Sequence, residues 1–225
     1  MSDYIEVMTI VEGKTEQVFV EMVLKPYLAE KMIFIQATQA SKPGQKGGDV
    51  KFSRVINDIR DHLKQRNDTY VTTLVDYYGI KEWPGLDSLA QNLTPSQIAD
   101  HLNAATKHQV VSEFANQQAE RRFIPYIAVH EFEALLFSDS AILASELGVD
   151  EDQVKSVLAE CGEPEAINNG KETAPSKRLD NWSPNGKFAK TTAGIAIAQQ
   201  IGITQMREQC PLFNAWLAQF EALVG

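Results

Sequence analysis

Segments with the composition of β-strands alternate with segments of helical periodicity through the first half of the chain. The strand-like segments are rich in β-branched and aromatic residues and span residues 4–11, 32–37, 69–76 and 123–129. Apolar residues recur near the helical period over residues 15–31, 49–66 and 94–115. Asp49 and Thr94 are candidate N-caps, and Pro95 stands at the first helical position. This alternation predicts an α/β fold with a mainly parallel sheet flanked by helices.

The pattern changes near residue 138. Residues 138–160 and 191–224 are helical in pattern, and a polar, turn-rich segment separates them. We therefore predict an α/β core over residues 1–137 and a helical C-terminal part, residues 138–225, that packs on the core.

Residues 11–16, with the sequence VEGKTE, contain Gly-Lys-Thr, as phosphate-binding P-loops do. A P-loop needs a further glycine five positions before that Gly, and Met8 stands there within a strand-like run. The segment is therefore not a Walker motif. It places Glu12 at a strand end, Gly13 in a turn, and Glu16 at the start of a helix.

Acidic residues follow three of the predicted strands, at the edge where open parallel sheets bind ligands. Glu16 adds to this group, because residues four apart share one face of a helix. Carboxylates gathered in one crevice repel one another, so a compensating cation is expected. Hard divalent cations suit oxygen-only sites and can activate water for phosphodiester hydrolysis. We predict that Mg²⁺ or Mn²⁺ is bound by Glu12, Glu16, Asp76, Glu131 and Glu133.

Each of these residues also has a structural interpretation. Glu12 could complement the N-terminus of the following helix, and Asp76 could cap a turn. His130 could be a structural histidine beside the later acids. Glu16, Glu131 and Glu133 could be surface acids, although the last two lie within the apolar run HEFEALLF, where charge is harder to explain in that way.

The net charge of the chain is −9 and its pI is near 5.0, which argues against a protein that coats DNA through a basic surface. A nuclease remains compatible, because bound metal neutralises the carboxylates that ligate it. The sequence shows no secretory leader and no apolar run long enough to span a bilayer, so we expect a cytoplasmic protein without a membrane partner. Cys161 and Cys210 are too few for a disulfide framework.

The pattern Glu-Gly-x-x-Glu at residues 12–16, an Asp after the third strand and a later Glu-x-Glu resemble the Toprim domain of topoisomerases, primases and OLD-family nucleases. The strings VEGKTE, RFIPYIAVHEFEALLFSD and APSKRL extend this resemblance, over nearly the whole chain, to a bacterial Toprim-like family of unknown function. The resemblance implies that Glu12 and Glu16 match the two glutamates of the nuclease branch and that Asp76 matches the first acid of Asp-x-Asp. Tyr78 stands where the second aspartate would be, which leaves open whether one or two metals bind.

The resemblance further implies a metal-dependent nuclease acting on DNA or RNA, as the effector of a phage-defence or toxin system. It also implies an ABC-type ATPase partner and allows for a homodimer. Lys177 is the expected catalytic phosphate contact, although it could equally be an exposed loop lysine, and Lys46, His130 and Arg178 are expected to contact the substrate. The rival hypotheses are a non-catalytic module for protein interaction or nucleotide sensing, and a different phosphoryl-transfer enzyme acting on a small nucleotide.

Overall fold

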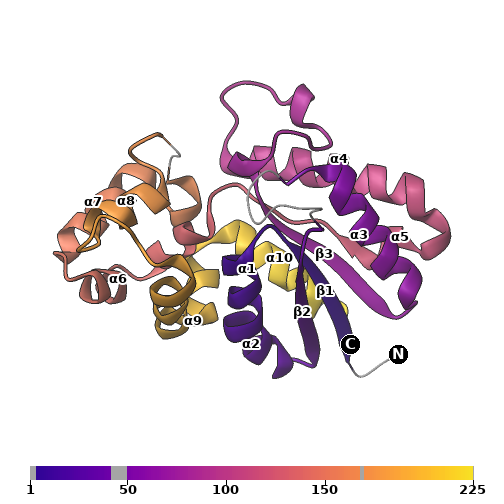
Figure 1. Ribbon diagram of the computed structural model, residues 1–225, viewed down its shortest axis with the longest axis horizontal. Coiled ribbons are helices and arrows are strands. Elements are labelled where there is room, and N and C mark those ends of the chain that lie inside the picture. Colours follow the sequence, from indigo (N-terminus) through magenta and orange to yellow (C-terminus); the bar gives the residue numbers. More distant parts are fainter. Residues whose placement is uncertain (1–3, 42–49, 168–169, 225) are drawn as a thin grey trace.

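A parallel β-sheet forms the centre of the computed structural model, which describes residues 4–41, 50–167 and 170–224 (Figure 1). The strands follow the order β2-β1-β3-β4, and β5 also pairs with β3. Their bounds are β1 (Ile5–Val11), β2 (Ile33–Gln39), β3 (Thr69–Asp76), β4 (Phe123–Ile124) and β5 (Ile127–Ala128). The predicted α/β fold with a mainly parallel sheet is confirmed.

Helices cover both faces of this sheet. Helices α3 (Phe52–Gln65) and α4 (Pro95–Phe114) pack on one face, in a cluster that includes Ile10 and Val71. The other face carries α1 (Lys14–Phe19), η1 (Val20–Leu24), α2 (Lys25–Ala29) and α10 (Pro211–Glu221). Helix α9 (Ile195–Gln209) lies beside them and packs against α1 and η1. Successive side chains of a strand point to opposite faces, which is why β1 and β3 contribute to both clusters.

The C-terminal helix α10 is part of the core that covers the sheet. Trp216 is buried, its Nε1 donates a hydrogen bond to Thr72 Oγ1 at 2.9 Å, and its ring stacks on Tyr126 with centroids 4.5 Å apart. The predicted C-terminal part therefore shares its hydrophobic core with the sheet, while a division at residue 137 stays a prediction.

The remaining elements are short or lie beside this central layer. On the C-terminal side they are η5 (Phe132–Ser138), α6 (Ser140–Leu147), α7 (Glu151–Cys161), η6 (Pro164–Ala166), α8 (Pro175–Trp182) and η7 (Lys190–Gly194). The connections before β4 contain η2 (Tyr77–Gly79), η3 (Leu86–Ser88), η4 (Ala115–Gln117) and α5 (Ala119–Arg122). Among the described residues, none of the helices has the combination of length and apolar composition needed to cross a bilayer.

Local structure follows the sequence closely at α4 and departs from it at two prolines. Thr94 caps α4 in a capping box with Gln97, as its predicted N-cap role requires. The helix predicted over residues 15–31 instead widens into the π-helical turn η1 immediately before Pro26. Pro26 lacks the N–H for an intrahelical hydrogen bond, and its ring crowds the preceding turn.

The strand predicted over residues 123–129 is split into β4 and β5, because Pro125 cannot donate to the β-ladder. The hydroxyl of Thr73 bridges the gap by accepting from the backbone N–H of Tyr126 at 3.1 Å. The strand region is followed by the 3-10 segment η5. Asp49, the other predicted N-cap, lies outside the described residues, and α3 begins at Phe52.

Candidate functional site

An open cleft of about 350 Å³ lies at the carboxyl edge of the sheet. It is formed by the end of β1, the start of α1, the end of β3, the segment before η5, and the start of η7. Its lining residues are Glu12, Gly13, Lys14, Thr15, Glu16, Asp76, Tyr78, Gly79, Glu131 and Lys190. The fold therefore brings four of the five predicted acids into one cleft.

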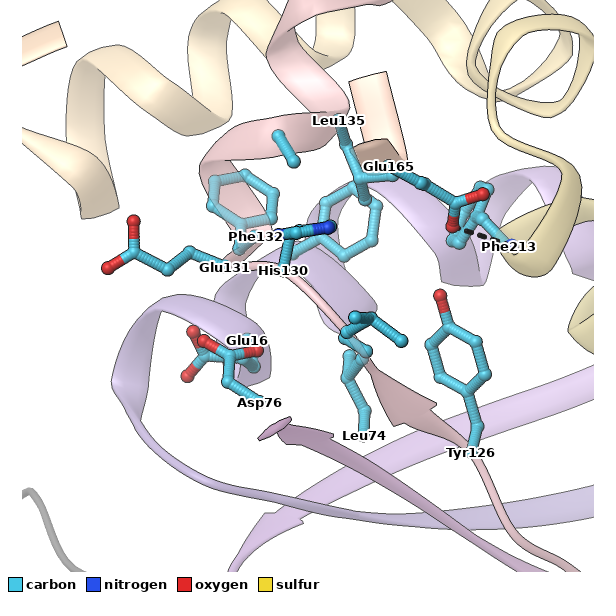
Figure 2. Close-up of a pocket in the computed structure, with 14 residues that line it drawn as sticks. Glu16, Leu74, Asp76, Tyr126, His130, Glu131, Phe132, Leu135, Glu165 and Phe213 are labelled. Carbon is cyan, nitrogen blue, oxygen red and sulfur yellow. Dashed lines mark hydrogen bonds between the residues drawn. The ribbon is translucent and has the colours of Figure 1, made fainter. Parts of the chain in front are cut away.

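Asp76 and Glu16 lie next to each other at the base of this cleft (Figure 2). Burial raises the pKa of Asp76 well above its ordinary value, and the negative charges of Glu16 and Glu12 raise it further. Burial also raises the pKa of Glu16, with Glu12 adding to the effect. The Oδ1 atom of Asp76 is buried and accepts no hydrogen bond from any described residue. A proton or a cation would therefore stabilise this pair.

Two glycines leave space for the carboxylates. A Cβ atom at Gly79 would lie 3.1 Å from Oε1 of Glu12, and one at Gly13 would lie 3.1 Å from Oε2 of Glu16. Both distances are shorter than ordinary van der Waals contact, so a side chain at either position would have to displace the neighbouring carboxylate. The backbone at these positions is therefore fitted around the two acids.

The fifth acid, Glu133, is 2% exposed and forms an ion pair with Lys190 from η7. Burial raises the pKa of Glu133, and the neighbouring ammonium opposes this effect. Burial disfavours the charged form of Lys190, but Glu133 and Glu131 outweigh it and raise the pKa of the lysine. Lys190 was not predicted as a site residue, because it belongs to a turn-rich segment whose position depends on the tertiary fold.

Glu131 contacts the N-terminus of α8. Its Oε2 atom accepts a hydrogen bond from the backbone N–H of Ser176 at 3.0 Å, a favourable position for a carboxylate. The two strings HEFEALLF and APSKRL therefore meet in space, through one side chain and one helix terminus. This contact accounts structurally for Glu131 without a metal.

Among the described residues, none of the predicted substrate contacts lines the cleft. Lys177 is exposed, and its Nζ atom lies 3.7 Å from Oδ2 of Asp180. Arg178 Nε donates a hydrogen bond to the backbone carbonyl of Thr173 at 2.8 Å. Neither side chain lines the cleft. His130 is buried behind it, and Lys46 lies outside the described residues.

A cavity of about 20 Å³ lies behind the acids and reaches toward α10 (Figure 2). It is lined by Asp76 and His130 near the cleft, and by Tyr126 and Glu165 at its far end. Glu165 is 6% exposed, and burial raises its pKa to about 7. Its two oxygens accept from the backbone N–H groups of Leu212 at 2.7 Å and Phe213 at 3.0 Å. Sequence reasoning missed this residue, since an isolated Glu in a turn-rich segment carries no signal of burial.

The acids are gathered but do not form a ready-made metal site. Within residues 4–41, 50–167 and 170–224, no group of three His, Cys, Asp or Glu side chains is arranged so that it could hold a metal ion. Glu131 and Glu133 are instead directed to Ser176 and Lys190. Metal binding by the five acids stays a prediction.

Comparison with protein families gives one match, to a domain of unknown function (DUF4276), over residues 11–221. The chain belongs to this family. The DUF4276 match includes every residue that lines the cleft, from Glu12 to Lys190. Neither the curated proteins nor the solved structures gave a match.

Proposed function

We propose that the protein is a metal-dependent phosphodiesterase of the Toprim type that cleaves nucleic acid. The observation that carries this proposal is the pair Asp76 and Glu16 at the base of an open cleft, with Glu12 beside them. A buried carboxylate oxygen without a hydrogen-bond donor, such as Asp76 Oδ1, is costly, and the raised pKa values of Asp76 and Glu16 express that cost. Binding of a cation would remove it.

The residues fit a hard divalent cation by their chemistry. Glu12, Glu16 and Asp76 offer only oxygen atoms, as Mg²⁺ and Mn²⁺ prefer, and Gly13 and Gly79 leave room for the carboxylates. When bound, such an ion lowers the pKa of a water molecule and stabilises charge on a phosphate. To hold one ion together, the carboxylates would have to approach one another more closely than in this structure.

The lysines of the cleft are suited to an anionic substrate. Lys190 is held by its ion pair with Glu133, and its side chain is still 44% exposed where it lines the cleft. Lys14 is exposed and also lines the cleft. Two lysines and four carboxylates line the cleft, and Lys190 is already paired with Glu133, so the carboxylates are in excess. A divalent cation would reduce this negative charge and allow a phosphodiester to approach. In this proposal Lys190 takes the phosphate-binding role that the sequence suggested for Lys177.

A non-catalytic interaction or nucleotide-sensing module is the second candidate. It is favoured by one observation, that Glu131 and Glu133 already have protein partners and need no metal. An ABC-type ATPase partner, a homodimer and a role in phage defence belong to the first proposal through the family resemblance alone. A cytoplasmic site of action is part of the same proposal.

Metal titration and cleavage assays separate the two candidates. Wild type, Glu12→Gln and the exposed control Glu30→Gln should be incubated with single- and double-stranded DNA and RNA, in Mg²⁺, Mn²⁺ or EDTA. We expect cleavage only with metal, loss of cleavage in Glu12→Gln, and wild-type behaviour in the control. Thermal unfolding gives a second measurement, because metal that binds the folded state raises the melting temperature. Cleavage that survives EDTA, or equal activity in Glu12→Gln, would refute the mechanism.

A further inference from the structure

An exposed aromatic ring lies among the charged residues of the cleft. Tyr78 is 54% exposed, one of a few large hydrophobic side chains that the described residues expose. Of these, it alone lines the acidic cleft, and Tyr4, Met22, Met32 and Phe34 do not. Tyrosine is enriched at binding interfaces, because its side chain joins an apolar ring to a polar hydroxyl.

The ring of Tyr78 is supported from within the protein. It stacks on the ring of the buried His130, with centroids 6.0 Å apart and planes inclined by 25°. The ring of Tyr77 meets it edge-on at 5.0 Å. With both contacts in place, Tyr78 is still 54% exposed. The ring is therefore partly fixed by its neighbours and partly open to a flat ligand.

The position of Tyr78 links this surface to the acids. It follows Asp76 by two residues in η2, and the next residue, Gly79, lies against the carboxylate of Glu12. A planar group stacked on Tyr78 would therefore lie beside the carboxylates, with its attached phosphate close to Lys14 or Lys190, which line the same cleft. Nucleobases stack on aromatic rings in this way, and every base offers such a face.

Base pairing and stacking hide these faces in a duplex, whereas a single strand exposes them. We infer that Tyr78 is a stacking platform for an unpaired nucleobase, so that the cleft binds single-stranded nucleic acid in preference to a duplex. The role of the neighbouring acids in cleavage rests on the proposed function, but the stacking contact does not.

Binding measured without cleavage tests this inference. The anisotropy of a labelled single-stranded oligonucleotide with a cleavage-resistant phosphorothioate backbone should be followed in Mg²⁺, with wild type, Tyr78→Ala, Tyr78→Phe, Tyr78→Trp and the control Tyr4→Ala. Tyr4 is similarly exposed, at 44%, but lies at the other end of β1. We expect Tyr78→Ala to weaken binding by roughly 5- to 100-fold, and the two aromatic variants and the control to stay within about 2-fold of wild type. A duplex of the same sequence should bind more weakly to the wild type and be little affected by Tyr78→Ala.

Unchanged single-strand affinity in Tyr78→Ala, with a fold intact by circular dichroism, would overturn the inference. An equal loss for single strand and duplex would also overturn it, because the ring would then only shape the cleft. A mononucleotide that binds through Tyr78, when the single strand does not, would overturn the assignment to a strand. Binding that depends on Tyr78 without any metal-dependent cleavage would support the inference and refute the proposed nuclease activity. Metal-dependent cleavage that is unchanged in Tyr78→Ala would support the nuclease activity and overturn the inference.

Discussion

Glu165→Gln should remove a large part of the pH dependence of stability between about pH 4.5 and 7. Burial raises the pKa of Glu165 from 4.5 to about 7 in the folded protein. Between these values the folded state retains a proton that the unfolded chain has released, so the free energy of unfolding falls as the pH rises. The contribution of Glu165 is complete below about pH 4.5 and lost above about pH 7. The difference between a pKa of 4.5 and one of about 7, at ~1.4 kcal/mol for each pH unit, corresponds to a change of ~3.5 kcal/mol.

The structure also predicts how the variant differs at a fixed pH. The two oxygens of Glu165 accept from Leu212 and Phe213 at the start of α10, and Gln can accept only one of these bonds. The variant should therefore be less stable than wild type at pH 4.5, by ~1 kcal/mol for the lost hydrogen bond. The difference should shrink and reverse above pH 7, where the buried carboxylate of the wild type is charged.

Urea unfolding followed by tryptophan fluorescence, across pH 4.5 to 8, measures this difference. Trp216 lies on α10, the helix whose start Glu165 contacts, and its fluorescence reports when this helix unfolds. The matched control is Glu163→Gln, a more exposed glutamate two residues earlier. Its charge makes only a minor contribution to the raised pKa of Glu165, so this variant should change the slope far less than Glu165→Gln. The other buried acids titrate in both proteins and cancel in the comparison. Equal pH slopes in wild type and Glu165→Gln would refute the reasoning and mean that water reaches this carboxyl group.

Three further substitutions test the electrostatics of the cleft and one buried anchor. Asp76→Asn should raise the melting temperature in EDTA by several degrees above neutral pH, because it removes a carboxylate whose pKa is raised by burial and by Glu16; a lower melting temperature would contradict this. Lys190→Met should lower the free energy of unfolding by ~1–3 kcal/mol at neutral pH, because it leaves the buried Glu133 without its ion pair. The loss should be smaller in acid and smaller when Glu133→Gln is also present. A double-mutant cycle measured by urea unfolding tests this. Arg122→Met should lower the free energy of unfolding by ~3 kcal/mol or more in the same assay, because Arg122 is 1% exposed and its guanidinium donates to backbone carbonyls that would lose their donor. A loss below ~1 kcal/mol would mean that water replaces the guanidinium.

Local and nearest-neighbour features were determined by the sequence itself. The N-cap at Thr94 depends on residues three apart, and such contacts form wherever the helix forms. Glu12 and Asp76 were predicted to share an edge because each ends a strand of a parallel sheet. The register of β1 and β3, with Val11 opposite Leu74, brings the two strand ends together. This prediction needed only strand direction and adjacency, which the alternation of elements specifies.

Only the tertiary structure decided which partners these acids have. Glu131 meets the N-terminus of α8, Glu133 meets Lys190, and Glu165 meets the start of α10. In each case the partner is far along the chain, in a helical part whose packing is not encoded by periodicity. A carboxylate near a strand end has the same sequence signature whether it faces a metal, a lysine or a helix terminus. Burial and the neighbouring charges distinguish these states, and both arise only when the C-terminal helices pack against the sheet.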